Sequence, residues 1–367
     1  MAFTVADREY MARALDLAAR GTYTTHPNPR VGCVLVRDGE IVGEGWHRVA
    51  GGPHAEVAAI ADAGERSRGA TAYLNLEPCS HEGRTGPCAP ALVDAGVSRV
   101  VSSMEDPNPD VSGAGHRILA AAGVTVQTGL LNQEAALLNG GFILRMTRGR
   151  PKVTIKLAAS LDGRTAMASG ESKWISGPES REDVQRLRAS SSAILTGIGT
   201  VLADDPSLNV RSPGCDTAGR QPVRVVVDST LKTPPTARML SLPGDTVIAC
   251  ADAAADPDLS QAGVTIIQLP GAGGRVDLEA LLDHLGRQEC NDLLVESGPA
   301  LCGALVAAQL ADELVLYVAP HLMGDTARGM FTLPGLDSMA DRVQLRVLET
   351  KVLGEDLRIR ATLRRAD

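Results

Sequence analysis

The sequence predicts a mixed α/β protein of two domains, and three observations support this fold class. The chain has 367 residues, and at about 100–200 residues per domain this length fits two or three domains. Segments with strand-like apolar patterns alternate with segments of helical periodicity, which is typical of layered α/β domains. An Arg-Gly-Arg-Pro run at 148–151 interrupts this alternation. We therefore expect one domain at residues 1–148 and a second at residues 151–367.

The first domain begins with a predicted helix and a predicted hairpin. Residues 7–20 place apolar side chains at helical spacing, and Gly21 follows as a stop signal. Residues 31–36 and 41–46 flank an Asp-Gly dipeptide, which is typical of a hairpin turn. After the hairpin we expect helices at 54–63, 88–95, 116–122 and 133–146, and strands at 70–76, 97–103 and 124–128.

The second domain contains more predicted strands than helices. We expect strands at 152–159, 193–196, 223–228, 246–250, 264–269, 293–296 and 313–318, and helices at 276–285 and 300–310. Residues 343–348 and 357–363 suggest a terminal antiparallel pair. The Ala- and Asp-rich stretch 251–262 predicts a surface loop.

The composition excludes several classes of protein. Hydrophobic residues make up 44% of the chain and charged residues 22%, which is typical of a globular enzyme and not of a disordered chain. The net charge is −8, and the chain has only three Phe, four Tyr and two Trp. These values argue against a basic or base-stacking surface for nucleic acid.

The compartment follows from two further observations. We find no signal peptide and no stretch near the ~20 apolar residues of a membrane helix, so we expect a cytoplasmic protein without a membrane partner. The seven cysteines should then be reduced. Cysteine in this chain is expected to serve packing, metal binding or catalysis.

The strongest functional motif combines His54-Ala55-Glu56 with Pro78-Cys79 and Cys88. One imidazole and two thiolates fit a catalytic zinc site whose fourth position is left for water, and zinc makes such a water acidic near neutral pH. Glu56 would shuttle protons without ligating the metal, as in the zinc deaminases. Residues two apart on a helix point roughly 200° apart, so His54 must lie at or before the first turn.

Two other interpretations remain open on the motif alone. Eight residues separate Cys79 from Cys88, where zinc deaminases usually have two, so Cys88 could be an ordinary residue at a helix start. The cluster could also be a structural zinc site fused to a binding module, although structural sites usually have four protein ligands. A deaminase of nucleosides or nucleic acids is the other enzyme candidate, and the acidic charge and few aromatic residues argue against it.

The surrounding sequence resembles the deaminase half of the bacterial bifunctional riboflavin-biosynthesis proteins. The matching segments are 26–33 (HPNPRVGC), 54–57 (HAEV), 76–88 (LEPCSHEGRTGPC) and 106–109 (DPNP). In that family the longer gap between the cysteines is normal. The resemblance implies a cytidine-deaminase-like three-layer fold, a zinc ion on His54, Cys79 and Cys88, and Glu56 as the proton shuttle.

Several other residues of this half have two interpretations. Asn28, in a loop bracketed by prolines, could hydrogen-bond the substrate ring or serve the turn. His81 and Arg84 could meet a substrate phosphate or be solvated. Cys33 is expected in the core, and His47 and His116 are interpreted as structural.

The resemblance continues into the reductase half of the same family. The matching segments are 156–166 (KLAASLDGRTA), 170–176 (GESKWIS), 186–189 (RLRA), 194–197 (ILTG), 200–206 (TVLADDP), 224–229 (RVVVDS) and 295–299 (VESGP). It implies a dihydrofolate-reductase-like fold that binds NADPH. The implied cofactor contacts are Ala158, Trp174, Thr200, Asp204, Ser229, Gly298, Pro299, Ala300, Leu301, Cys302, Gly303 and Ala304. The implied substrate contacts are Ser172, Arg188, Arg211 and Glu296.

The residues of the second half would not identify this cofactor by themselves. Gly197-Ile198-Gly199 lacks the third glycine of a dinucleotide fingerprint. The Ser297-Gly298 turn between a strand and a helix could admit a phosphate at the helix N-terminus, or it could be a plain tight turn. Arginine in this half suits a phosphorylated substrate, because guanidinium groups bind phosphate bidentately. Cys215, Cys250, Cys290 and Cys302 show no metal-ligand spacing.

The sequence therefore predicts a bifunctional enzyme of riboflavin synthesis. The first domain is expected to deaminate a diaminohydroxypyrimidine that carries a phosphoribosylamine, using one zinc ion. The second is expected to reduce the ribosyl group to ribityl with NADPH. The expected partners are phosphorylated pyrimidines and further copies of the chain in a homo-oligomer, without nucleic acid or membrane.

Overall fold

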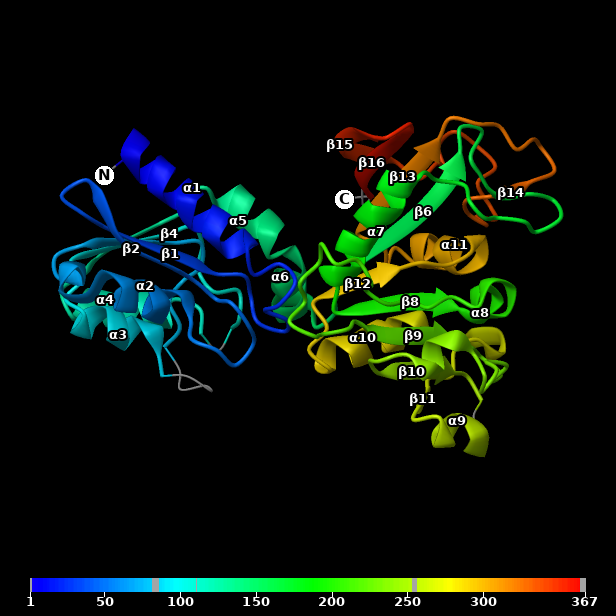
Figure 1. Cartoon of the computed structure of the whole chain (residues 1–367), viewed down its shortest axis with the longest axis horizontal. Coiled ribbons are helices and arrows are strands. Elements are labelled where there is room, and N and C mark those ends of the chain that lie inside the picture. The colour runs from blue at the N-terminus through cyan, green and yellow to red at the C-terminus, as the bar shows by residue number, and fades with distance from the viewer. Residues whose placement is uncertain (1, 81–85, 110, 253–255, 364–367) are drawn as a thin grey trace. The chain divides into compact units, whose positions relative to one another are not determined.

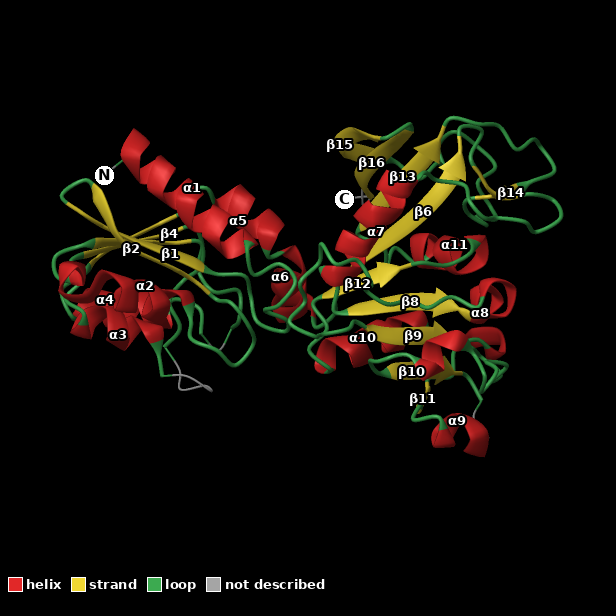
Figure 2. Ribbon diagram, in the orientation of Figure 1, coloured by secondary structure: helices red, strands yellow, loops and turns green. Residues whose placement is uncertain are grey.

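The computed structural model describes the chain except residues 1, 81–85, 110, 253–255 and 364–367. The chain divides into two compact units, Met1–Gly149 and Arg150–Asp367. Each unit has its own sheet with helices on both faces (Figure 1, Figure 2). Within the described residues, no helix is both long enough and apolar enough to cross a bilayer.

The first unit is built on a five-stranded mixed sheet. The strand order is β2 (Glu40–Trp46), β1 (Gly32–Arg37), β3 (Thr71–Leu74), β4 (Arg99–Ser102) and β5 (Thr125–Thr128). The β1–β2 hairpin is antiparallel, β3 pairs antiparallel to β1, and β3, β4 and β5 run parallel. The turn residues Asp38 and Gly39 both have positive φ, as the sequence predicts for a tight hairpin.

Helices cover both faces of this sheet and make three layers. They are α1 (Val5–Ala19), α2 (Ala55–Ala63), α3 (Cys88–Asp94), α4 (Ala114–Ala121), α5 (Asn132–Leu138) and α6 (Gly140–Arg148), with a 3₁₀ turn at Gly64–Ser67. Neighbouring residues of β1 alternate between the two faces. Val34 packs with α1, and Cys33 packs with α2 and α3. The sequence therefore predicts the three-layer fold correctly.

The sequence predicts one helix at 133–146, and the structure contains two. The break falls at Asn139, where φ is −111°. The Asn139 side chain pairs with the backbone of Arg30: its Oδ1 accepts from the Arg30 N–H at 2.8 Å and its Nδ2 donates to the Arg30 carbonyl at 2.9 Å. This long-range pairing, followed by two glycines, explains why helical periodicity alone misses the break.

The second unit is built on a nine-stranded sheet. The strand order is β11 (Thr265–Gln268), β10 (Thr246–Cys250), β9 (Val223–Val227), β8 (Ala193–Gly197), β12 (Asp292–Val295), β6 (Lys152–Ser160), β13 (Glu313–Ala319), β16 (Asp356–Leu363) and β15 (Leu345–Leu353). The strands from β11 to β13 are parallel, and β16 and β15 are antiparallel additions at the edge. The terminal pair expected from the sequence is present. A short separate ladder joins β7 (Arg164–Ala166) to β14 (Arg328–Gly329).

Helices again lie on both faces of the second sheet. They are α7 (Pro178–Ala189), α8 (Ile198–Asp204), α9 (Pro257–Gln261), α10 (Leu278–Arg287) and α11 (Pro299–Ala307), with 3₁₀ turns at Arg238–Ser241 and Ala272–Gly274. Leu293 and Val295 of β12 pack with α10 and α11, whereas Leu294 packs with α8 and α9. The parallel strands therefore have two buried faces and bring their carboxyl ends to one edge.

Three helices of this unit differ from the sequence prediction. The expected loop at 251–262 contains α9, because Asp256 accepts hydrogen bonds from the N–H groups of Asp258 and Leu259 and the Leu259 side chain is fully buried. Helices α7 and α8 lie where no helix is predicted. Helix α7 is mostly polar, so hydrophobic periodicity does not reveal it.

Candidate active sites

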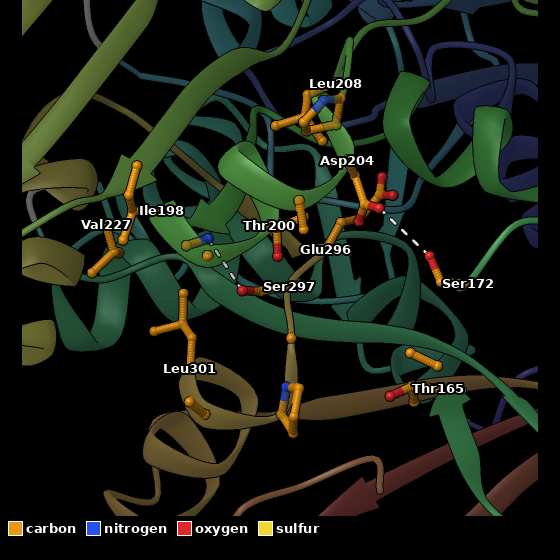
Figure 3. Close-up of a pocket in the computed structure, with 18 of the residues that line it drawn as sticks. Thr165, Ser172, Ile198, Thr200, Asp204, Leu208, Val227, Glu296, Ser297 and Leu301 are labelled. Atoms are coloured by element: carbon orange, nitrogen blue, oxygen red, sulfur yellow. Dashed lines mark hydrogen bonds between the residues drawn. The ribbon is translucent and has the colours of Figure 1, made fainter. Parts of the chain in front are cut away.

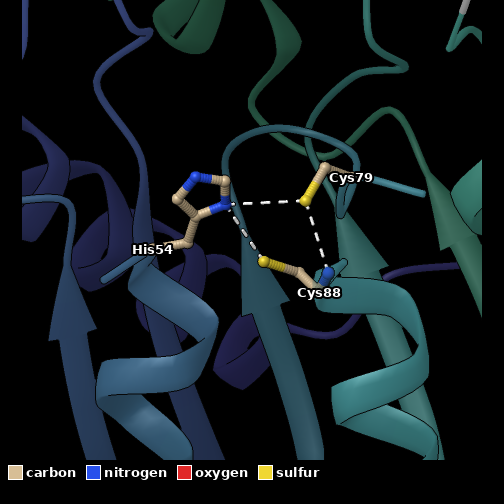
Figure 4. Close-up of side chains that lie close together, drawn as sticks. All are labelled: His54, Cys79 and Cys88. Atoms are coloured by element: carbon tan, nitrogen blue, oxygen red, sulfur yellow. Dashed lines mark hydrogen bonds between the residues drawn. The ribbon is translucent and has the colours of Figure 1, made fainter. Parts of the chain in front are cut away.

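Three side chains of the first unit meet at a candidate metal centre. His54 Nδ1 lies 3.2 Å from Cys88 Sγ and 3.5 Å from Cys79 Sγ (Figure 4). Among the described residues this is the group of His, Cys, Asp or Glu side chains whose ligand atoms lie within 4.8 Å of one another. One imidazole nitrogen and two sulfurs fit zinc and leave a coordination position for water.

Local structure explains why these three residues converge. His54 precedes α2 in an extended conformation, with φ −71° and ψ 163°. The direction of its side chain relative to that of Glu56 is therefore not set by the roughly 200° that separates residues two apart on a helix. A Cβ on Gly45 of β2 would lie 2.3 Å from the Ala55 carbonyl, and only glycine lets the start of α2 approach the sheet so closely. Cys88 begins α3, and its N–H donates to Cys79 Sγ at 3.3 Å.

The two thiols lie in different electrostatic surroundings. The neighbouring Cys88 and His54 lower the pKa of Cys79, whereas Cys79 and burial raise the pKa of Cys88. Cys79 therefore has thiolate character, which is the form that binds metal. The eight-residue gap between the cysteines does not separate them in space, so the structure favours Cys88 as a ligand over an ordinary helix-start residue.

Glu56 lies in the first turn of α2 and is 3% exposed. Burial, together with the nearby Cys79, raises the pKa of Glu56 to about 7. A carboxyl with this pKa can both accept and release a proton near neutral pH. Cys33 is fully buried in β1 as expected, and Glu56 contributes to the raised pKa of its thiol.

His47 lies beside the candidate metal centre, although the sequence gives it no partner. Its ring packs edge-on against His54 with centroids 5.5 Å apart. His47 Nδ1 lies 3.0 Å from the Pro53 carbonyl, which can only accept, so the other ring nitrogen accepts from Asn28 Nδ2 at 3.0 Å. Burial lowers the pKa of His47. The structure thus brings Asn28 towards this site through His47.

Glu77, next to Pro78 and Cys79 in the sequence, organises a loop near the metal ligands. Its Oε2 accepts from the N–H groups of Asp106 and Gly113, and its Oε1 accepts from those of Gly115 and His116. Glu77 is 3% exposed. A lone Glu before Pro-Cys gave no sign of this role. His81 and Arg84 lie outside the described residues.

The second unit has a pocket of about 950 Å³ at the carboxyl ends of its parallel strands (Figure 3). This is near the upper limit of small-molecule sites, which measure about 300–1,000 Å³, so the pocket can hold two ligands side by side. Ligands of open parallel sheets usually bind at this edge.

Most of the residues implied for the cofactor line this pocket. They are Ala158, Trp174, Thr200, Asp204, Ser229, Gly298, Pro299, Ala300, Leu301 and Ala304. Cys302 and Gly303 do not line it in the described structure. Cys302 is fully buried in the core, and a Cβ on Gly303 would lie 2.0 Å from the Thr332 carbonyl. These two residues therefore lie on other sides of α11, and their assignment as cofactor contacts stays a prediction.

The four residues implied for the substrate also line the pocket. Arg188 binds Glu296 bidentately, with Nε 2.6 Å from Oε1 and Nη2 2.9 Å from Oε2, and its Nη1 donates to the Asn209 carbonyl. Three of the five N–H donors of Arg188 are thus engaged within the protein. Arg211 is exposed and keeps more of its donors available. Ser172 Oγ lies 3.5 Å from Asp204 Oδ1.

Lys156 joins this cluster, and the sequence prediction missed it. Its Nζ lies 3.7 Å from Glu296 Oε2. Burial by itself would raise the pKa of Glu296, but Arg188 and Lys156 outweigh it and hold this pKa at about 2. Burial lowers the pKa of Lys156. The available signal is a lysine in the middle of β6, a strand that is otherwise mostly apolar and begins with Lys152.

The hydrogen-bond donors of the pocket suit the phosphates of a dinucleotide. Helix α11 begins at Gly298 without a side-chain cap, so its first N–H groups remain available for an anion. A Cβ on Gly298 would meet only Thr200 Oγ1, at 4.0 Å, which leaves room for a phosphate. Trp174 is 69% exposed, and the Arg181 guanidinium lies 4.7 Å from its ring centre.

Comparison with known proteins gives a family match for each unit. Residues 151–359 match the model of the RibD C-terminal domain, and residues 4–104 match the cytidine and deoxycytidylate deaminase zinc-binding region. The riboflavin biosynthesis protein RibD of Escherichia coli is 52% identical over 362 residues, covering 96% of this chain and 98% of the relative.

Solved structures agree over the same length. RibD of Acinetobacter baumannii superposes with a TM-score of 0.93 and 45% identity, covering 98% of this chain and 99% of that one. A diaminohydroxyphosphoribosylaminopyrimidine deaminase/5-amino-6-(5-phosphoribosylamino)uracil reductase of Thermotoga maritima gives a TM-score of 0.85 and 32% identity, with the same coverage. The fold, the His-Cys-Cys cluster and these matches together show that the chain belongs to the RibD family of bifunctional deaminases and reductases of riboflavin biosynthesis.

Proposed function

We propose that the first unit hydrolytically deaminates 2,5-diamino-6-(5-phosphoribosylamino)pyrimidin-4-one and that the second unit reduces the ribosyl side chain of the product to ribityl with NADPH. The observation that carries the first step is the cluster of His54, Cys79 and Cys88 with the buried carboxyl of Glu56 beside it. Three protein ligands and a neighbouring carboxyl suit hydrolysis better than a structural site. The Thermotoga maritima relative is named as a diaminohydroxyphosphoribosylaminopyrimidine deaminase and a 5-amino-6-(5-phosphoribosylamino)uracil reductase, which supports the choice of the two substrates.

In the deaminase unit, His54, Cys79 and Cys88 would hold one zinc ion, which when bound supplies a Lewis acid that makes water acidic near neutral pH. Glu56 takes a proton from the attacking water and returns it to the departing amino group. The ring carbon gains oxygen and loses ammonia. Asn28, which donates to His47, keeps its carbonyl oxygen available to accept from the pyrimidine.

In the reductase unit, Ala158, Trp174, Thr200, Asp204, Ser229 and the start of α11 (Gly298, Pro299, Ala300, Leu301 and Ala304) would bind NADPH, which when bound supplies hydride. Ser172 and Glu296 would orient the substrate. Because Arg188 is paired with Glu296, we assign the substrate phosphate chiefly to Arg211, with Arg188 supporting the site through its charge.

We further propose that the protein acts in the cytoplasm as a homo-oligomer. The seven cysteines are unpaired in the structure, which suits a reducing compartment. The edge strand β15 exposes apolar side chains, among them Val347 at 58% and Val352 at 69%. An exposed apolar edge strand favours association with another copy.

The experiment that tests the proposal gives the purified protein the pyrimidine substrate with and without NADPH. Ammonia should appear without NADPH, and NADPH should be consumed only with the deaminated product. Glu56→Gln should keep its zinc but lose ammonia release by roughly 10²–10⁴-fold, while NADPH oxidation with the deaminated product stays unchanged. Absence of ammonia release from zinc-loaded wild-type protein would refute the proposed deamination.

A further inference from the structure

The pocket of the second unit has a part at the end of β9 that the substrate cluster does not reach. Glu296 follows β12, and two strand spacings separate β12 from β9 in the sheet, which is roughly 10 Å. At the β9 end the lining includes Val227, Val276 and Leu278. Val227 is among the side chains drawn in the pocket in Figure 3. These apolar side chains suit a flat aromatic ring such as adenine.

Arg275 lies at this end of the pocket, in a loop whose conformation is held by backbone hydrogen bonds. The Gly271 N–H donates to the Arg275 carbonyl at 2.7 Å, and the Asp277 N–H donates to the Leu269 carbonyl at 2.9 Å. The Val276 N–H donates to Ser229 Oγ at 3.2 Å. Arg275 therefore directly precedes a residue, Val276, that is hydrogen-bonded to Ser229. Both Arg275 and Ser229 line the pocket.

The polar groups here suit an anion. Arg275 is exposed, and it takes part in none of the ion pairs found among the described residues. Because Ser229 Oγ accepts from Val276, its hydroxyl proton is left to donate outward. The neighbouring Asp228 also lines the pocket, but its side chain is fully buried. Its Oδ2 accepts from the Thr233 N–H and hydroxyl at 2.7 Å, and its Oδ1 is buried without a hydrogen-bond partner among the described residues, so its charge weakens the attraction for an anion and does not contact the ligand directly.

We infer that Arg275, together with Ser229, binds the 2′-phosphate on the adenosine ribose of the cofactor and so selects NADPH over NADH. The inference rests on the proposed function, since it requires a nicotinamide dinucleotide in this pocket. A guanidinium group offers a planar set of donors that matches phosphate oxygens, and the Ser229 hydroxyl adds another donor. NADH, with a plain hydroxyl at this position, would leave Arg275 without an ionic partner.

Lys232 is the other exposed cation in this part of the lining. It lies in the turn after β9, whereas Arg275 is joined to Ser229 through the Val276 hydrogen bond. We therefore assign the selectivity to Arg275. Arg238, which also lines the pocket, is paired with Asp205.

The test measures equilibrium binding of NADPH and of NADH to the full chain by the change in reduced-nicotinamide fluorescence. In Arg275→Ala, NADPH binding should weaken by roughly 10- to 100-fold, as expected for losing hydrogen bonds to a charged group, and NADH binding should not change. Arg275→Lys should be intermediate because it keeps the charge but not the planar donors. Arg287→Ala, at the end of α10 and outside the pocket lining, is the control for net charge.

A second arm uses the adenosine part alone. Adenosine 2′,5′-bisphosphate should displace NADPH from the wild type more strongly than adenosine 5′-monophosphate, and Arg275→Ala should remove the difference. An unchanged ratio of NADPH to NADH affinity in Arg275→Ala, or a ratio that collapses only in Lys232→Ala, would overturn the inference. A wild-type protein that binds neither NADPH nor NADH would refute the proposed reductase function itself.

Discussion

Replacing Glu296 by Gln should destabilise the reductase unit in a way that depends on pH. Glu296 and Arg188 have side chains 11% and 10% exposed and form a bidentate pair, with Lys156 beside it. The variant keeps the shape of the side chain but leaves two buried cations without a counter-ion. Removing one partner of a buried ion pair typically costs about 3–5 kcal/mol, far more than loss of an exposed pair.

The shifted pKa of Glu296 gives a second value for the stability that its ionised form contributes. The pKa of Glu296 falls from 4.5 to about 2, and at about 1.4 kcal/mol per pKa unit this difference corresponds to about 3 kcal/mol. Since the folded protein holds the lower pKa, this stability is complete above pH 4.5 and is lost as the pH falls towards 2. The difference between wild type and Glu296→Gln should therefore be about 3 kcal/mol at pH 7 and should shrink at pH 3.

Hydrogen exchange measured by mass spectrometry can follow this unit alone, through peptides that cover β6 and β12. A loss of about 3 kcal/mol in opening free energy should speed their exchange by about a hundredfold at pH 7. Glu279→Gln, an exposed carboxyl on α10, is the matched control and should have no effect. A difference from wild type of less than about 1 kcal/mol at pH 7, or one that persists undiminished at pH 3, would contradict the role of Glu296 as the counter-ion of Arg188 and Lys156.

Three further outcomes follow from the structure. Cys88→Ala should lose bound zinc, measured by metal analysis, and ammonia release, yet keep NADPH oxidation with the deaminated product; loss of both activities would contradict independent sites. Chelation of zinc from the wild type should reproduce this pattern, and added zinc should restore ammonia release. Gly303→Ala should lower stability by about 3 kcal/mol or more, because its Cβ would lie 2.0 Å from the Thr332 carbonyl. Gly199→Ala, with no atom within 4 Å of the added Cβ, should be neutral or slightly stabilising by thermal denaturation.

Local patterns predict most of the fold because apolar periodicity and turn residues act within a few residues of chain. The β1–β2 hairpin and the parallel strands of the second sheet are examples. The errors arise where distant groups decide the outcome. Asn139 ends a helix by pairing with the Arg30 backbone, and α9 forms because Asp256 caps it and Leu259 is buried. Neither contact can be read from a short window of sequence.

The candidate sites also contain residues that local sequence predicts and residues that depend on a partner distant in the chain. His54 and Cys79 are recognisable from the His-x-Glu and Pro-Cys motifs, whereas the prediction for Cys88 rests on the family resemblance because eight residues separate it from Cys79. Lys156 and His47 are not recognisable in this way, since each matters only through a partner distant in the chain, Glu296 for Lys156 and Asn28 for His47. The residues of α11 face different neighbours, so the family segment 298–304 includes residues that line the pocket and two, Cys302 and Gly303, that do not.

Glu77 has a consequence for how the protein acquires its metal. Four amide groups between residues 106 and 116 converge on this carboxylate, and only Pro78 separates it from the ligand Cys79. The loop and the ligand are therefore held together before any ion arrives. A chelating group that is already ordered loses little entropy when it binds, so we expect the zinc affinity of this centre to depend in part on Glu77, a carboxylate that we place outside the ligand set.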